Sequence, residues 1–175
     1  MKDRIKQWEK AFDGHKKLTE EVWEDILKKA DPEEYESLGD DAACNAMNEF
    51  TSAASKFHLG TVDLSSPNSM HGDGCWSDIY RLPGGTTVIT RGATYEMSGP
   101  SGMVYRGDDY DAMLDIAYEL ITEDRDYGTV QHLEDGETCD SNADTIIEVD
   151  EILLKWKRAL KREQRDSTAK TTMEE

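Results

Sequence analysis

The distribution of glycine and proline divides this chain into three parts. Between Gly60 and Gly107 lie 9 of the 13 glycines and 3 of the 4 prolines. These residues interrupt helices and favour turns, whereas the segments on either side place apolar residues at the spacing of an α-helix. The pattern predicts an α+β fold in which N-terminal helices and two C-terminal helices flank a small antiparallel sheet of three to four strands.

The residues before the glycine-rich region predict four helices, which makes residues 1–58 mainly helical. The first helix has Ile5, Trp8 and Phe12 on one face and ends at Gly14. Asp31 followed by a proline is typical of an N-terminal cap. The predicted helices span about 5–13, 19–30, 32–38 and 41–57.

Residues 76–107 predict a β meander. Strands at 79–82 and 86–91 flank the turn residues Pro83-Gly84-Gly85, which is a β-hairpin pattern. Strands at 94–97 and 103–106 flank a second turn that contains glycine and proline. Residues 60–76 are expected to form an irregular loop.

Residues 108–165 predict two helices, separated by a polar stretch of weak periodicity at 125–140. The first spans 109–123. The second spans 142–164, and its apolar residues step by three and four positions along one face: Ile146, Val149, Leu153, Trp156 and Leu160. Such a seam packs inside the domain or, alternatively, joins two chains in a homodimer. We expect residues 1–166 to form one domain and residues 167–175 a disordered tail.

The negative charge of the chain is concentrated in one segment. The chain has 38 acidic and 20 basic residues, a net charge of −18. Residues 108–151 hold 16 acidic residues and one basic residue, Arg125, which gives 1 − 16 = −15. Charge of this density repels nucleic acid and anionic membranes and attracts basic protein surfaces. We therefore expect a protein partner with a basic surface, no direct contact with nucleic acid and no membrane binding.

The helix predicted at 109–123 carries a row of carboxylates four residues apart: Asp111, Asp115, Glu119 and Glu123. Like charges at this spacing destabilise an isolated helix by roughly 0.2–0.5 kcal/mol per pair. The row is either the solvated face of an acidic protein or a surface that imitates the phosphates of nucleic acid. For the second interpretation, further candidate partner-binding residues are Asp108, Asp109, Glu33 and Glu36.

Imitation of nucleic acid leads to a functional hypothesis. The protein would block the DNA- or RNA-binding surface of a host defence protein or another nucleic-acid enzyme, as antirestriction and anti-CRISPR phage proteins do. An immunity-type protein that neutralises a basic toxin is an alternative, because the electrostatic requirement is the same.

A third hypothesis is a small metal-dependent enzyme. His71, Asp73 and Cys75 alternate with glycines, and His58 or His132 would supply a further ligand if the fold brings it near. However, the chain has no GxSxG, HExxH or GxxxxGK[ST] motif, so we expect no enzyme and no cofactor. Its three cysteines lack CxxC spacing, and no apolar run reaches the ~18 residues that would cross a bilayer, which together favour free thiols and a cytoplasmic protein.

Overall fold

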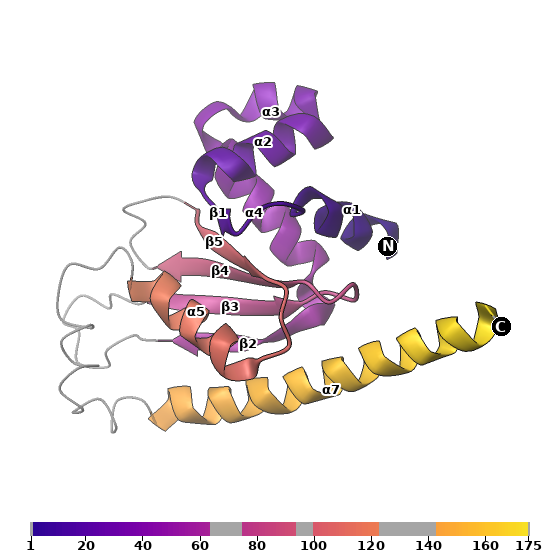
Figure 1. Ribbon diagram of the computed structural model, residues 1–175. Helices are drawn as coiled ribbons and strands as arrows, with labels where there is room; N and C mark the ends of the chain where they lie inside the picture. The colour runs from indigo at the N-terminus through magenta and orange to yellow at the C-terminus, as the bar shows by residue number, and fades with distance from the viewer. Residues whose placement is uncertain (1, 64–74, 94–99, 123–142, 175) are drawn as a thin grey trace.

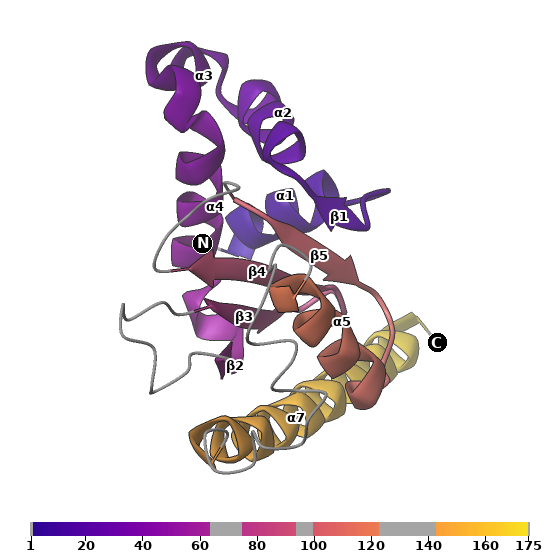
Figure 2. The same ribbon diagram turned by 90° about the vertical axis from the view of Figure 1, so that its left-hand side faces the viewer.

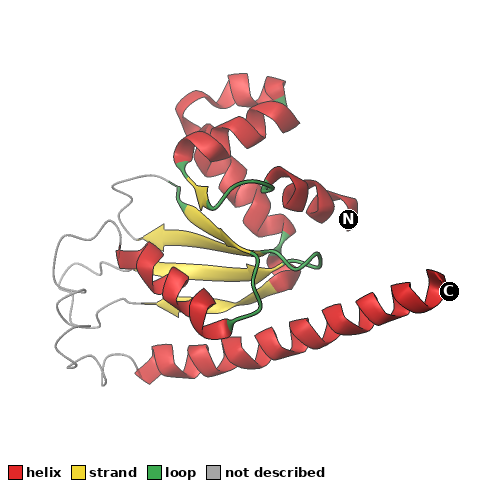
Figure 3. Ribbon diagram, viewed as in Figure 1, coloured by secondary structure: helices red, strands yellow, loops and turns green. Residues whose placement is uncertain are grey.

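A five-stranded antiparallel sheet lies between two layers of helices (Figure 1). This arrangement is seen in a computed structural model that describes residues 2–63, 75–93, 100–122 and 143–174. Helices α1, α2 and α4 cover one face of the sheet, and α5 and α7 cover the other. The α+β class is therefore confirmed, with helices at both ends of the chain (Figure 3).

The predicted N-terminal helices are all present. Thr19 caps one of them by accepting the Val22 N–H at 3.3 Å, and Asp31 caps the next by accepting the Glu34 N–H at 3.0 Å. The fourth helix is shorter than predicted, because a 3₁₀ turn, η2 (Ser55–Phe57), replaces its last residues. A second 3₁₀ turn, η1 (Gly39–Asp41), precedes it. The helices are α1 (Lys2–Ala11), α2 (Glu20–Ala30), α3 (Pro32–Leu38) and α4 (Ala42–Ala53).

The sheet has five strands instead of the predicted three to four, because β1 and β2 were not predicted. Its order is β1-β5-β4-β3-β2. The expectation of an irregular loop over 60–76 is wrong at both ends, because residues 60–63 belong to β2 and residues 75–76 to β3, and these two strands pair. Residues 64–74 lie outside the described residues. Residues 94–97, a predicted strand, lie outside the described residues. The strands are β1 (Lys17–Leu18), β2 (His58–Asp63), β3 (Cys75–Arg81), β4 (Thr87–Ala93) and β5 (Gly102–Tyr105).

Successive residues of a strand pack into the cores on opposite faces of the sheet, because side chains alternate between the two faces. Tyr80 pairs with Val88, and both belong to the core under α1, α2 and α4. Ile79 pairs with Ile89, and both belong to the core under α5 and α7. The sheet is therefore apolar on both faces.

The two C-terminal helices are α5 (Tyr110–Thr122) and α7 (Ala143–Glu174). α7 continues through residues 167–174, where the sequence predicts a disordered tail. Its 32 residues correspond to about 48 Å of helix, and the last part extends beyond the sheet (Figures 1 and 2). Among residues 149–174 of α7, whose side chains are described, Ile152, Trp156 and Ala159 are buried, whereas the predicted Leu153 is only partly buried. No helix in the described ranges is long and apolar enough to span a membrane.

Arg81, at the end of β3, joins the sheet to both of these helices. Its side chain is 2% exposed, and its Nε and Nη2 atoms donate to Glu163 of α7 at 2.8 and 3.0 Å. Nη2 also donates to Asp108, just before α5, at 3.0 Å. The guanidinium lies 4.8 Å from the ring centroid of Trp156. Arg81 thereby fixes α7 over the end of the sheet.

Candidate functional site

The carboxylate row predicted on the helix at 109–123 lies on the exposed face of α5. Asp111, Asp115 and Glu119 are exposed, and α5 contains no lysine or arginine. The opposite face of α5 packs into the core through Met113, Leu114, Ala117 and Leu120. Helical phasing thus gave the orientation of these three carboxylates correctly. Glu123, the fourth predicted member, lies outside the described residues.

Asp108 and Asp109 lie immediately before α5 and have contacts within the fold. Asp108 pairs with Arg81, although 76% of its own side chain is exposed. Asp109 Oδ1 accepts the Ala112 N–H at 3.2 Å, as an N-terminal cap does. Both carboxylates extend the negative surface of α5 towards its N-terminus. They also stabilise the start of this helix, so their substitution would not test binding alone.

Glu33 and Glu36 are not brought together with α5. They are exposed on α3, which belongs to the helical layer on the other face of the sheet (Figures 1 and 2). The neighbouring Asp40 and Asp41 of η1 are also exposed. The described candidate carboxylates therefore lie on two separate acidic surfaces, one on α5 and one on α3 with η1.

A basic groove lies between α7 and the segment formed by η2 and the start of β2. Its volume is about 590 Å³. One wall contains Phe57, His58 and Leu59, and none of the described residues that line the groove is acidic. We call it the α7 groove; its cationic lining residues are Lys56, Lys155, Arg158, Lys161, Arg162 and Arg165.

The cations of the α7 groove differ from other cations of the structure. Ion pairs join Arg4 to Glu49, Lys29 to Asp25, Arg81 to Glu163 and Asp108, and Arg106 to Asp13. Within the described ranges, none of the six groove cations forms an ion pair with a carboxylate. The groove therefore concentrates positive charge that the described carboxylates do not neutralise through ion pairs.

The sequence analysis did not identify this groove. A signal was present, because Lys155, Arg158, Arg162 and Arg165 step by three, four and three positions along α7, the spacing of one helix face. Counting charge by segment concealed it, since Glu163, Asp166, Glu174 and Glu175 offset four of the seven basic residues in the sum for residues 152–175, which is 7 − 4 = +3. The facing wall from Lys56 to Leu59 depends on tertiary packing, which no local pattern reveals.

The wall of the groove that contains His58 is held by hydrogen bonds. His58 Nε2 lies 3.0 Å from Asp78 Oδ1, and the Thr61 hydroxyl donates to the same oxygen at 2.6 Å. The imidazole also lies 5.1 Å from the Tyr80 ring, between centroids. Burial and the charge of Asp78 raise the pKa of Tyr80. His58 thus has a fixed place in the wall of the groove.

The predicted metal site falls mainly on residues outside the described ranges. His71, Asp73 and His132 belong to these, and Cys75 begins β3. His58, a candidate for a further ligand, contacts Asp78 through its Nε2 atom. Among the described residues, no three His, Cys, Asp or Glu side chains gather as metal ligands would.

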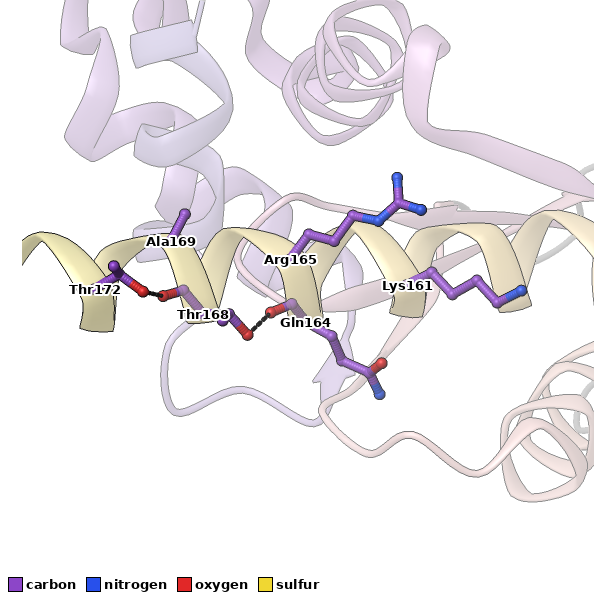
Figure 4. A pocket seen from close by; sticks show the side chains of 6 residues that line it. All are labelled: Lys161, Gln164, Arg165, Thr168, Ala169 and Thr172. Atoms are coloured by element: carbon purple, nitrogen blue, oxygen red, sulfur yellow. Dashed lines mark hydrogen bonds between the residues drawn. The ribbon is translucent and has the colours of Figure 1, made fainter.

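A second hollow, of about 470 Å³, continues along the exposed end of α7 (Figure 4). Lys161 and Arg165 line both this hollow and the α7 groove. Further along, the hydroxyls of Thr168 and Thr172 donate to carbonyl oxygens one turn earlier, each at 2.9 Å. The basic surface therefore continues into a neutral, hydroxyl-bearing one.

Comparisons of this chain with protein-family models, with curated proteins and with solved structures find no match. Its function is therefore inferred from its own charged surfaces.

Proposed function

We propose that the protein is an inhibitor that binds the basic surface of a nucleic-acid-binding protein through carboxylates of α5. The observation that carries this proposal is the row of Asp111, Asp115 and Glu119, all exposed on a helix without lysine or arginine. Consecutive members are about 6 Å apart along the helix axis. Nucleic-acid-binding proteins make most of their contacts to regularly spaced negative charge, and the row offers such charge.

The setting of α5 favours binding without rearrangement. The helix is anchored by buried Met113, Ala117 and Leu120, so its charged face is held in place before a partner arrives. Preorganised groups lose less conformational entropy on binding. Charge complementarity of this kind also accelerates association and makes it sensitive to salt. A basic toxin would bind to the same acidic surface of α5. The immunity-type role therefore differs from the proposed role only in the identity of the partner.

The test begins with the full chain immobilised and lysate from its own cells passed over it at low and high salt. A captured protein is identified, purified and mixed with labelled nucleic acid. We expect the chain to displace the nucleic acid from its partner. Displacement should be lost in the Asp115→Lys/Glu119→Lys variant, because the two reversals replace the centre of the row by positive charge.

A matched control is Asp150→Lys/Glu151→Lys, which makes the same change in net charge at exposed positions of α7. This control should retain displacement. The variant Glu33→Lys/Glu36→Lys reports separately on the acidic surface of α3. Equal loss of displacement in all three variants would show that net charge matters and that the α5 row does not. A captured partner that keeps its nucleic acid in the presence of the unmodified chain would contradict the proposal that the chain occupies the nucleic-acid-binding surface.

A further inference from the structure

We propose that the α7 groove binds the phosphate backbone of a single-stranded nucleic acid. This site is distinct from the acidic row, since it lies on another helix and carries the opposite charge. Its six lysine and arginine side chains face a common hollow, and the part of the lining that the structure describes contains no acidic residue. Concentrated, unneutralised positive charge in a concave site is the electrostatic footprint of a polyanion site.

The net charge of −18 does not preclude such binding. At physiological ionic strength the Debye length is about 8 Å, so charges farther away are largely screened. A phosphate in the groove interacts mainly with the cations that line it. The expectation that this protein makes no contact with nucleic acid rests on the negative charge concentrated in residues 108–151, whereas the groove is lined by cations of η2 and α7.

The length of the basic row fits several phosphates. From Lys155 to Arg165 the helix rises by about 15 Å. A single strand whose bases keep the stacking distance of a duplex strand has one phosphate per about 3.4 Å, so about four phosphates fit along this distance. Three members of the row are Arg158, Arg162 and Arg165, and arginine forms bidentate hydrogen bonds with phosphate.

The size and the other wall of the groove favour a single strand over a duplex. A volume of about 590 Å³ is that of a small-ligand site, and a duplex, whose major groove alone is about 12 Å wide, is too broad to enter it. Phe57 and His58 supply partly exposed rings opposite the basic row. Proteins that bind single strands combine a basic channel with aromatic rings on which bases stack.

The experiment measures binding of fluorescently labelled oligothymidine, about ten nucleotides long, to the full chain by anisotropy. With about four phosphate contacts, the affinity should fall roughly 50-fold between 50 and 200 mM salt. The variant Arg158→Gln/Arg162→Gln should bind at least about tenfold more weakly and should lower the slope of log affinity against log salt by about 1.4.

The matched control is Lys157→Gln/Lys170→Gln, which removes two charges from exposed positions of the same helix outside the groove. It should bind within about twofold of the unmodified chain. Circular dichroism and thermal unfolding of each variant verify that the fold is retained. Equal loss in both variants, or no binding by the unmodified chain at 50 mM salt, would overturn the proposal.

Three further probes identify the ligand chemistry. Polyglutamate of similar length and a matched DNA duplex should both bind more weakly than oligothymidine. Phe57→Leu should weaken the binding of oligothymidine more than the binding of inorganic polyphosphate, because polyphosphate has no bases to stack. Tighter binding of polyglutamate would assign the groove to an acidic protein segment instead, and tighter binding of the duplex would reject the single-strand geometry. Failure here leaves the test of the α5 row unaffected, because that test uses different residues and a basic partner.

Discussion

Arg81 shows how a charged residue can be part of the core of this protein. Burial disfavours its charged form, but the hydrogen bonds and charges of Glu163 and Asp108 outweigh this effect and raise the pKa of Arg81. The guanidinium also donates to Thr87 and to the Gly107 carbonyl oxygen, at 3.0 and 2.9 Å. These contacts join β3, β4, α7 and the start of α5 at one side chain.

The first prediction concerns the removal of this guanidinium. Arg81→Leu should lower the free energy of unfolding by about 3 kcal/mol, because it leaves the partly buried Glu163 without its partner. Arg4→Leu is the control, since Arg4 pairs with Glu49 at 3.8 Å and both side chains are partly exposed; it should cost less than about 1 kcal/mol. Urea unfolding measures both changes, and equal costs would contradict the role of Arg81.

Glu9 of α1 is a carboxylate whose environment disfavours its charge. Its Oε1 accepts the Gly84 N–H at 2.9 Å. Burial raises the pKa of Glu9, and the charge of Glu163 adds to the rise, while hydrogen bonds from Gly84 and Thr86 and the charge of Arg81 partly offset it. The folded protein therefore holds this proton more tightly than the unfolded chain does.

The second prediction follows from this difference. The contribution of Glu9 to stability should fall as the pH rises from the unfolded pKa, near 4.3, through the higher folded pKa. Glu9→Gln removes the titrating group. The stability of Glu9→Gln relative to the unmodified chain should therefore increase between about pH 4 and pH 7 in urea unfolding. A constant difference, or a change in the other direction, would show that the folded environment does not disfavour the Glu9 charge.

At the scale of elements, the packing of α7 on β2 determines the α7 groove. Gly60 of β2 has φ of +152°, and a Cβ atom there would lie 2.5 Å from Ile152 Cγ1. Ile152 is fully buried. The missing side chain at residue 60 therefore permits the close approach of helix and strand that forms the groove.

The third prediction tests this contact. Gly60→Ala should destabilise the protein by about 1–3 kcal/mol, because the added methyl group overpacks the core. Ile152→Ala should cost about 2–5 kcal/mol through the cavity it leaves. The double variant should lose less than the sum of the two, since each change relieves the other. Additive losses in urea unfolding would mean that the two residues are not in contact.

The same elements show what the sequence could predict. The N-terminal helices were predictable because their apolar spacing and caps, such as Thr19 and Asp31, are local. β1 was missed because its two residues are too few to show alternation. β2 was missed because Gly60 indicated a loop, although this glycine serves the packing of Ile152. The exposed row on α5 followed from helical phasing, whereas the α7 groove required the tertiary position of Lys56 and Phe57.

At the scale of the whole molecule, the two signs of charge are separated in space. The acidic row lies on α5, and the cations of the α7 groove lie where α7 passes η2 and β2. Both helices pack on the same face of one sheet. Arg81 contacts Glu163 of α7 and Asp108, which precedes α5. The sheet thus holds two oppositely charged surfaces in a fixed relation. We propose that the two surfaces bind different partners independently.

One crossed binding measurement tests this claim most directly. Labelled oligothymidine and labelled oligolysine are titrated separately with the full chain, with Arg158→Gln/Arg162→Gln and with Asp115→Lys/Glu119→Lys. We predict that the groove variant weakens oligothymidine binding at least about tenfold and changes oligolysine binding less than about threefold, and that the α5 variant weakens oligolysine binding while oligothymidine binding stays within about threefold. If both variants instead change the affinity for both ligands in proportion to their change in net charge, the two surfaces do not act as separate sites.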